Sequence, residues 1–401
     1  MPDRTRVLCV FTAAYFLSFF FRSANAVIAP SLARDMALGA RELGLMTSLF
    51  YAAFAAAQIP IGAALDRFGP RWVTAVLMLT AASGSLLFAG AHSIWVLSAG
   101  RALMGAGMAG VLMGGLKAVS QWYPRERFAA ASALLIGVGT LGALAATTPL
   151  AWLNAVLGWR AVFLGGAAVV ALSAASVAAW TRGADGPDSA PGPATQGPAA
   201  PGLARVFADT RFWRIALLNF FLTGTLLATQ GLWGGPYLYD VARLPKIVAG
   251  NVLLLLGAGL ALGAFVVGRF ANRFGLARVV VAAAALFAAT QVILATGPQA
   301  GLLPGLFFCF GLTGAGNFML LAHARLAFPL AMTGRAVTAV NLFGIGGAFL
   351  LQWWMGLIVG AFPAGAAGHY PPQAYTAAFL FTAAGTLVTL TLYTPLARRS
   401  D

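Results

Sequence analysis

Two arginines lie inside apolar stretches that are long enough to cross a membrane. Arg22 lies in FTAAYFLSFFFRSANAVIAP and Arg101 in SAGRALMGAGMAGVLMG. A charged side chain at the centre of a bilayer costs about 2.5–3.5 kcal/mol even on lenient scales, so such residues usually mark a pathway for a polar molecule. A guanidinium can hold a carboxylate or another oxyanion through two parallel hydrogen bonds. The pair therefore predicts an anion site, unless Arg22 extends outward to the interface and Arg101 braces two helices through backbone carbonyls.

The acidic residues are distributed in the opposite way. None lies in the middle of an apolar run, because all ten fall in expected loops, tails and span ends: Asp3, Asp35, Glu42, Asp66, Glu126, Asp185, Asp188, Asp209, Asp240 and Asp401. A cavity with two fixed positive charges and no negative one repels cations and favours an anion. Three groups near span ends are placed for reversible protonation, namely Asp35, Asp240 and His323.

The composition is that of a membrane protein. Hydrophobic residues make up 60% of the chain, charged residues only 9%, and 48 residues are glycine. A soluble chain of 401 residues could not bury this much apolar surface, whereas small residues let membrane helices approach closely. The net charge of +15 is not accompanied by a patch of aromatic and basic residues, so no nucleic-acid partner is expected.

An internal repeat divides the chain. An offset of 206 residues aligns Gly44 with Gly250 and the Arg-Phe-Gly at 67–69 with the Arg-Phe-Gly at 273–275. Parallel repeats of hydrophobic bundles are typical of alternating-access membrane proteins. Because a span needs about 20 apolar residues, we expect twelve spans, six in each copy: 7–30, 43–65, 72–91, 94–119, 128–151, 159–181, 212–236, 247–268, 277–297, 302–325, 336–361 and 375–396.

The expected fold is an all-α polytopic membrane protein with twelve transmembrane helices in two pseudo-symmetric six-helix bundles. The bundles are residues 1–181 and 212–401, and residues 182–211 join them as a cytoplasmic linker. Residues 183–202 are rich in Gly, Pro and Ala, which predicts a flexible tether. The first apolar run is too long and too polar at its centre for a cleaved signal peptide, so it is expected to stay as the first helix.

Basic residues indicate the orientation, because Lys and Arg are retained on the cytoplasmic side. With both termini inside, eighteen basic residues in loops, tails and span ends fall on the inner side, and the outer side keeps only five: Arg34, Arg41, Arg160, Arg243 and Lys246. We therefore expect a multi-pass protein of the bacterial inner membrane with both termini in the cytoplasm.

The loop after the second span contains the pattern G-x-x-x-D-R-x-G-x-R at 62–71. This pattern resembles the signature of the major facilitator superfamily. The second copy has Asn272 in place of Asp66. Asp66 can accept charge-assisted hydrogen bonds from arginines or a helix N-terminus, and Gly69 permits a tight turn. In that superfamily such loops latch the two bundles in one conformation, so the resemblance implies a conformational latch made of Gly62, Asp66, Arg67, Gly69, Arg71 and Arg273.

In the superfamily, spans one, four, seven and ten line a central cavity, and each of them carries polar residues here. In span seven such residues recur at i, i+4, i+11, i+14 and i+18, which predicts one polar stripe: Asn219, Thr223, Gln230, Trp233 and Tyr237. For any single amide or hydroxyl, an interhelical hydrogen bond is the alternative role. With Arg22 as the anion grip, the resemblance implies these substrate-binding residues: Tyr15, Arg22, Asn25, Arg101, Asn219, Thr223, Gln230, Trp233, Asn317 and Asn341.

The resemblance implies a secondary active transporter that works by rocker-switch alternating access. The two arginines predict that it moves a small organic anion or carboxylate-bearing metabolite. We expect a monomer in the lipid bilayer. No cofactor is expected, and the absence of a G-x-x-x-x-G-K-[ST] motif argues against direct use of ATP. Transport would be driven by a co-transported proton, through Asp35, Asp240 or His323, or by an exchanged anion.

Three alternatives differ in function. A proton-coupled efflux antiporter for drugs or metabolites is disfavoured because no acid lies mid-span. A non-transporting sensor is disfavoured because the tails are short and the linker is of low complexity. A copper importer could use Met104 and Met108, but no matching Met or His pair occurs in spans seven or eight, so no metal site is expected. An enzyme is not expected either, because no nucleophile, base and orienting group can be assembled.

Overall fold

The computed structural model describes residues 4–181, 203–365 and 368–397, and every regular element in these ranges is a helix. The flexible tether expected at 183–202 lies outside the described residues. Of the expected linker 182–211, residues 203–211 are described, and they contain the short helix α8 (Leu203–Ala208) and the start of the next helix.

Backbone contacts divide the chain into two compact units. Unit 1 comprises residues 1–38 and 49–196, and unit 2 comprises residues 39–48 and 197–401. Residues 39–48 precede unit 1 residues in the same helix, yet they pack within unit 2. A Cβ atom on Gly44 would lie 3.0 Å from Cα of Gly356 and 3.4 Å from the ring of Trp233, so a glycine is needed for this close approach.

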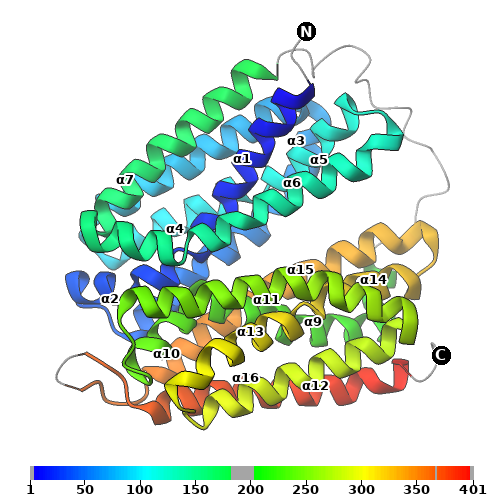
Figure 1. Ribbon diagram of the computed structural model, residues 1–401. Helices are drawn as coiled ribbons and strands as arrows, with labels where there is room; N and C mark the ends of the chain where they lie inside the picture. Colours follow the sequence, from blue (N-terminus) through cyan, green and yellow to red (C-terminus); the bar gives the residue numbers. More distant parts are fainter. Residues whose placement is uncertain (1–3, 182–202, 366–367, 398–401) are drawn as a thin grey trace. The chain divides into compact units, whose positions relative to one another are not determined.

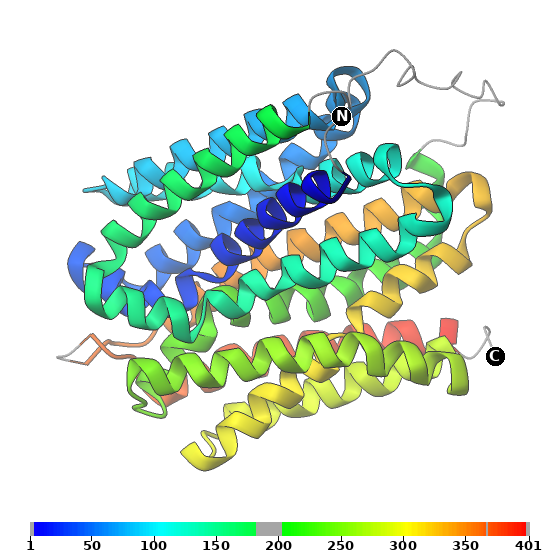
Figure 2. The same cartoon turned by 45° about the horizontal axis from the view of Figure 1, so that its top comes forward.

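Unit 1 is built from α1 to α7, which are labelled in Figure 1. Helix α1 packs along α6, and the two run side by side in both Figure 1 and Figure 2. The bounds of the helices are Arg4–Ser23 (α1), Asn25–Met36 (α2), Ala40–Ala89 (α3), Ile94–Met108 (α4), Val111–Trp122 (α5), Arg125–Ala145 (α6) and Thr148–Trp180 (α7).

Helix α3 contains two spans. Its 50 residues are interrupted at Gly69, whose φ of 74° and ψ of 164° lie outside the helical region and suit only glycine. Helix α7 is interrupted in the same way at Gly158, with φ 78° and ψ 159°. The expected fifth span, 128–151, is broken between Ala145 and Thr148, and its last residues lie in the part of α7 that precedes Gly158.

Unit 2 is built from α8 to α16, with one π-helix and one 3₁₀ turn. Helix α9 packs along α15, α11 along α13 and α12 along α16. After α8 the bounds are Thr210–Ala228 (α9), Thr229–Trp233 (π), Gly234–Asp240 (α10), Lys246–Phe274 (α11), Leu276–Ala295 (α12), Ala300–Leu302 (3₁₀), Leu303–Gly314 (α13), Asn317–Ala327 (α14), Leu330–Val359 (α15) and Pro372–Ala397 (α16).

The described residues contain eleven helical stretches that are long and apolar enough to cross a membrane. Because α3 supplies two spans on either side of Gly69, the stretches correspond to the twelve expected spans. The prediction of an all-helical, twelve-span protein is confirmed.

Besides the fifth span, four expected spans are interrupted rather than continuous. Span one breaks at Ala24, span four at 109–110 and span ten at 315–316, and span seven passes through the π-helix. The π-helix has a local cause. Pro236 has no N–H to donate to the carbonyl of Leu232, and the neighbouring glycines favour the helical conformation less than other residues do. These four spans are the ones expected to line a cavity.

The internal repeat is also seen where a glycine of one helix packs directly against the backbone of another. A Cβ atom on Gly105 of α4 would lie 2.0 Å from the carbonyl oxygen of Phe50 in α3. A Cβ atom on Gly311 of α13 would lie 2.0 Å from the carbonyl oxygen of Leu256 in α11. The offset of 206 relates both members of these pairs. The two units therefore use the same glycine-mediated helix contact.

Candidate functional site

Arg101 is completely buried, the deepest burial of a charged residue among the described residues of unit 1. Its Nη1 donates a 3.0 Å hydrogen bond to the carbonyl oxygen of Phe21, in the last turn of α1. The last carbonyls of a helix lack partners within the helix, so Arg101 satisfies one of them just before the break at Ala24. Its Nε and Nη2 atoms are buried and have no hydrogen-bond partner among the described residues.

Arg22 lies on α1, one residue beyond Phe21, and is partly buried. Its guanidinium carbon lies 4.8 Å from the ring centre of Phe19 and 4.9 Å from that of Phe54, and its buried Nε has no partner. No ion pair of the described residues includes Arg22 or Arg101. The arginines thus present buried N–H donors with no carboxylate opposite them.

Two tyrosines accompany the arginines. Tyr51 of α3 is 2% exposed and packs against Phe50, whose ring lies 4.9 Å from the guanidinium carbon of Arg101. The sequence did not single out Tyr51, because it lies in span two, outside the four spans examined for polar faces. Tyr15 packs edge-on against Phe19 at 5.0 Å between ring centres, and Asn25 is the buried first residue of α2.

Unit 2 has a hydrogen-bonded chain of three polar side chains instead of arginines. Asn219 Nδ2 donates to the carbonyl oxygen of Val340 in α15 at 2.8 Å, and Thr223 Oγ1 donates to Asn219 Oδ1 at 2.8 Å. Asn317 Nδ2 of α14 in turn donates to Thr223 Oγ1 at 3.2 Å. The chain ends at Asn317 Oδ1, which is buried and has no partner among the described residues. Asn341, next to Val340, is partly exposed.

The π-helix separates the polar residues expected to form one stripe along span seven. Trp233 Nε1 donates to the carbonyl oxygen of Gln352 at 2.9 Å, in α15. Tyr237 instead donates to the carbonyl oxygen of Leu294 at 2.8 Å, in α12. Gln230 lies within the π-helix and is partly buried. Asn219 and Trp233 thus bond to the same helix, α15, whereas Tyr237 bonds to α12, because the π-helix shifts the register of the residues that follow it.

The residues considered for proton coupling each have partners. Asp35 accepts a hydrogen bond from Trp159 Nε1 at 2.8 Å and lies 3.6 Å from Arg160. Asp240, at the end of α10, is 8% exposed and accepts from His369, the backbone N–H of Tyr370 and the hydroxyl of Tyr375.

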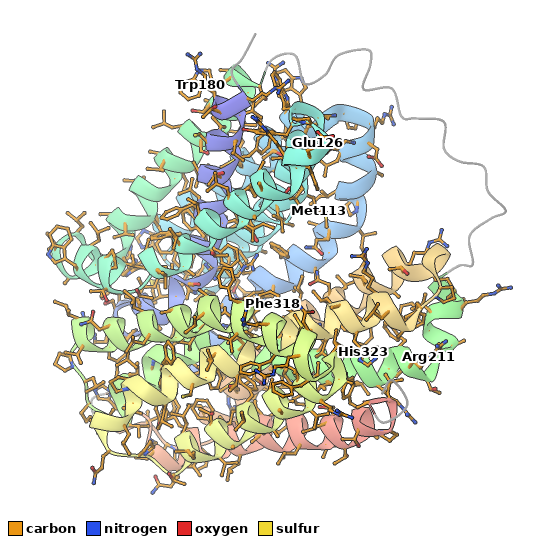
Figure 3. All side chains as sticks on the ribbon, turned by 45° about the vertical axis from the view of Figure 1, so that its right-hand side comes forward. Met113, Glu126, Trp180, Arg211, Phe318 and His323 are labelled. Carbon is orange, nitrogen blue, oxygen red and sulfur yellow. The ribbon has the colours of Figure 1, made fainter. Side chains whose placement is uncertain are left out.

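His323 lies on α14, where Figure 3 labels it together with Phe318. Its Nδ1 is hydrogen-bonded to the hydroxyl of Tyr393 in α16, and the side chain is 5% exposed. His323 and the two carboxylates belong to separate clusters, because the hydrogen bonds of Asp35 and Asp240 go to other helices and loops.

The expected loop at 62–71 lies within α3, on both sides of the break at Gly69, and it makes an ion pair with α5 that the motif alone did not identify. Asp66 accepts from Lys117 Nζ of α5 at 2.7 Å, and the same Nζ donates to the carbonyl oxygen of Leu65 at 2.8 Å. Arg71 donates from Nε to the carbonyl oxygen of Ala178 at the end of α7, at 2.7 Å. The loop is thereby tied to α5 and α7 within unit 1.

The remaining residues of the proposed latch make fewer contacts. Arg67 stacks on Phe68 with 5.1 Å to the ring centre, and Arg273 stacks on Phe274 with 5.2 Å. A Cβ atom on Gly62 would meet no other atom within 4 Å, so helix packing does not require a glycine there.

The sequence model of the Major Facilitator Superfamily matches residues 11–352. The chain belongs to this superfamily. The crystal structure of the nucleoside transporter NupG has the same fold, with a TM-score of 0.77 over 97% of this chain and 98% of that chain at 14% identity. With eleven stretches able to cross a bilayer in its described residues, this superfamily member is a multi-pass membrane protein.

Curated relatives match part of this superfamily member. The nitrate/nitrite transporter NrtP of Picosynechococcus sp. is 34% identical over 139 residues, which cover 35% of this chain and 26% of NrtP. The probable sulfoacetate transporter SauU of Cupriavidus necator is 29% identical over 164 residues, 41% of this chain and 38% of SauU. A probable L-galactonate transporter of Escherichia coli is 28% identical over 160 residues, 40% of this chain and 35% of that protein. The chain thus spans well under half the length of the curated relatives it matches.

Proposed function

We propose that the protein is a secondary transporter that moves a small organic anion across the bacterial inner membrane. The observation that carries the proposal is Arg101, which is fully buried with two unpaired nitrogen atoms and no carboxylate partner among the described residues. A buried charge without a counter-charge is strongly unfavourable. A bound anion supplies that counter-charge, and Arg22, with its own unpaired Nε, supplies a second donor.

The comparisons support this choice of substrate. Nitrate, sulfoacetate and galactonate, the molecules in the names of the relatives, are all anions. A proton-coupled exporter of lipophilic cations is disfavoured, because two positive charges in the membrane-spanning part of unit 1 repel a cation.

The mechanism we propose is the alternating access of the superfamily, with both termini in the cytoplasm as the distribution of Lys and Arg predicts. The loop at 62–71, held by Asp66 and Lys117, would stabilise one conformation of the cycle. A proton, through Asp35, Asp240 or His323, or a second anion would drive transport. The chain would work as a monomer.

The proposal is tested by ligand stabilisation of the purified protein. The panel contains organic anions, nitrate, neutral sugars and lipophilic cations, and a ligand at 100 times its Kd adds about 2.7 kcal/mol to the stability. We expect stabilisation by anions alone, and uptake of the same anions into proteoliposomes. Arg22→Gln should abolish both effects, since it removes the charge while keeping an amide donor.

The matched control is Arg160→Gln. Arg160 is also an arginine of unit 1, but it stacks on Trp159, donates to the carbonyl oxygen of Ala91 and has Asp35 as a counter-charge at 3.6 Å. This variant should bind anions as the wild type does. Stabilisation by cations, or normal anion uptake by Arg22→Gln, would contradict the proposal.

A further inference from the structure

We propose that Asn317 Oδ1 accepts a hydrogen bond from a hydroxyl group of the substrate, so that the transported anion is a hydroxylated carboxylate. This inference rests on the proposed function, because it names a chemical group that the transported anion carries. It depends on the direction of the hydrogen bonds that connect Asn317, Thr223 and Asn219.

The direction of that chain is set by a backbone carbonyl. The carbonyl oxygen of Val340 can only accept, so Asn219 must turn its NH₂ group toward it. The other end of the Asn219 amide is then an oxygen, and the hydroxyl of Thr223 must donate to it. Having used its single hydrogen, Thr223 can only accept from Asn317. The amide orientations therefore follow from the network rather than from an arbitrary choice between oxygen and nitrogen.

The open end of the chain is consequently an acceptor. Asn317 Oδ1 is buried and receives no hydrogen bond from the described residues. A buried acceptor without a donor is unfavourable, and a ligand that supplies the donor is bound more tightly than one that does not. An anionic oxygen cannot be that group, because it has no hydrogen to donate and repels the carbonyl lone pairs. A hydroxyl fits.

This acceptor is not required by the fold. At the offset of 206, Asn317 corresponds to Val111 in unit 1, which is fully buried. Unit 1 thus forms the same break between two helices, at 109–110, without an amide after it. The unpaired buried atoms of the two units therefore differ in kind: N–H donors at Arg22 and Arg101 in unit 1, and an acceptor at Asn317 in unit 2.

The test compares pairs of acids that differ by a hydroxyl: lactate with propionate, and D-gluconate with its singly deoxygenated analogues. Dissociation constants for the full-length protein are measured by calorimetry. In the wild type we expect at least one hydroxylated acid to bind about 10-fold more tightly than its deoxy partner, which corresponds to one lost hydrogen bond to a buried acceptor. In Asn317→Leu this preference should disappear.

Two further variants separate recognition from folding. Thr223→Val removes the hydroxyl that orients Asn317, so it should reduce the preference even if Asn317→Leu does not fold. Thr313→Val is the matched control, because Thr313 lies in the neighbouring helix α13 and its hydroxyl bonds to the carbonyl oxygen of Cys309 in the same helix. The control should keep the preference.

The outcomes distinguish this inference from the function on which it rests. If the wild type binds each deoxy acid as tightly as its hydroxylated partner, or if Asn317→Leu keeps the preference, the hydroxyl site is wrong and the anion transporter stands. If no acid binds, or if Arg22→Gln leaves acid binding intact, the proposed function itself is wrong.

Discussion

The two units share a backbone arrangement and differ in the charge of their interiors. Gly105 on Phe50 in unit 1 and Gly311 on Leu256 in unit 2 make the same contact. Four residues before these glycines, unit 1 has Arg101 and unit 2 has Phe307, and both are completely buried. The comparison shows that the same close contacts between helices can form in both units although the residue four positions earlier is charged in one unit and apolar in the other.

A second difference lies near the loops at 62–71 and 268–278. Unit 1 has the ion pair of Asp66 with Lys117, and the offset of 206 places Asn272 and His323 at the corresponding positions of unit 2. His323 bonds instead to Tyr393. In unit 1 an ion pair therefore joins segment 62–71 to α5. In unit 2 the corresponding helix, α14, is instead joined to α16 by a buried hydrogen bond.

The strongest way to break this comparison is to exchange the buried residues. Phe307→Arg should destabilise the protein by about 3–5 kcal/mol, because the carboxylate of Asp240, the buried acid that unit 2 contains among its described residues, is already hydrogen-bonded to other groups. Arg101→Phe should keep the fold but lose anion binding. Thermal unfolding and anion titration of both variants check this. Equal stability of Phe307→Arg and wild type would mean that unit 2 also tolerates a buried cation.

The shared glycine contacts should be equally sensitive in both units. Gly105→Ala and Gly311→Ala should each cost up to about 3 kcal/mol, because the new Cβ would press on a backbone oxygen that cannot turn away. Thermal unfolding measures the loss. Gly137→Ala and Gly268→Ala are the controls, one in each unit, since a Cβ there meets nothing within 4 Å. A large loss in one unit alone would show that the contacts are not equivalent.

The buried hydrogen bond between His323 and Tyr393 in unit 2 can be removed by a substitution that keeps the aromatic ring. Tyr393→Phe deletes the hydroxyl that bonds to His323 and should destabilise the protein by about 1 kcal/mol. Thermal unfolding in detergent reports the change. Tyr239→Phe is the control, because the Tyr239 hydroxyl is buried without a partner, and this variant should be as stable as the wild type or more so. A similar loss of stability in Tyr393→Phe and Tyr239→Phe would mean that the hydrogen bond to His323 does not stabilise the protein.

The smallest effect on stability is expected for the ion pair of unit 1. Asp66→Asn makes the first loop like the second, and because the Asp66 side chain is 77% exposed the stability should change by less than about 1 kcal/mol. Transport should nevertheless slow while the Kd for the anion stays the same. Asn272→Asp, which adds an acid at the corresponding position, should not speed transport. A changed Kd in Asp66→Asn would place Asp66 in binding rather than in the conformational cycle.

Much of the fold could be predicted because it depends on local features. Apolar runs long enough to cross a bilayer, interrupted by basic residues and glycines, indicate the spans in any tertiary context. Gly69, where φ is 74°, illustrates a turn whose residue type follows from backbone sterics alone. The buried arginines also stood out, since a charge within an apolar run is unusual whatever surrounds it.

The partners of the polar residues could not be predicted, because they depend on how each helix is rotated about its axis. The sequence by itself determined the superfamily signature, the repeat, the spans and the presence of two intramembrane arginines. Only the tertiary structure decided that Lys117 pairs with Asp66, and that Asn219, Thr223 and Asn317 form one directed chain. It also decided that Tyr237 leaves the expected stripe for α12, because one π-turn shifts the helical register and rotates every later side chain by about 100°.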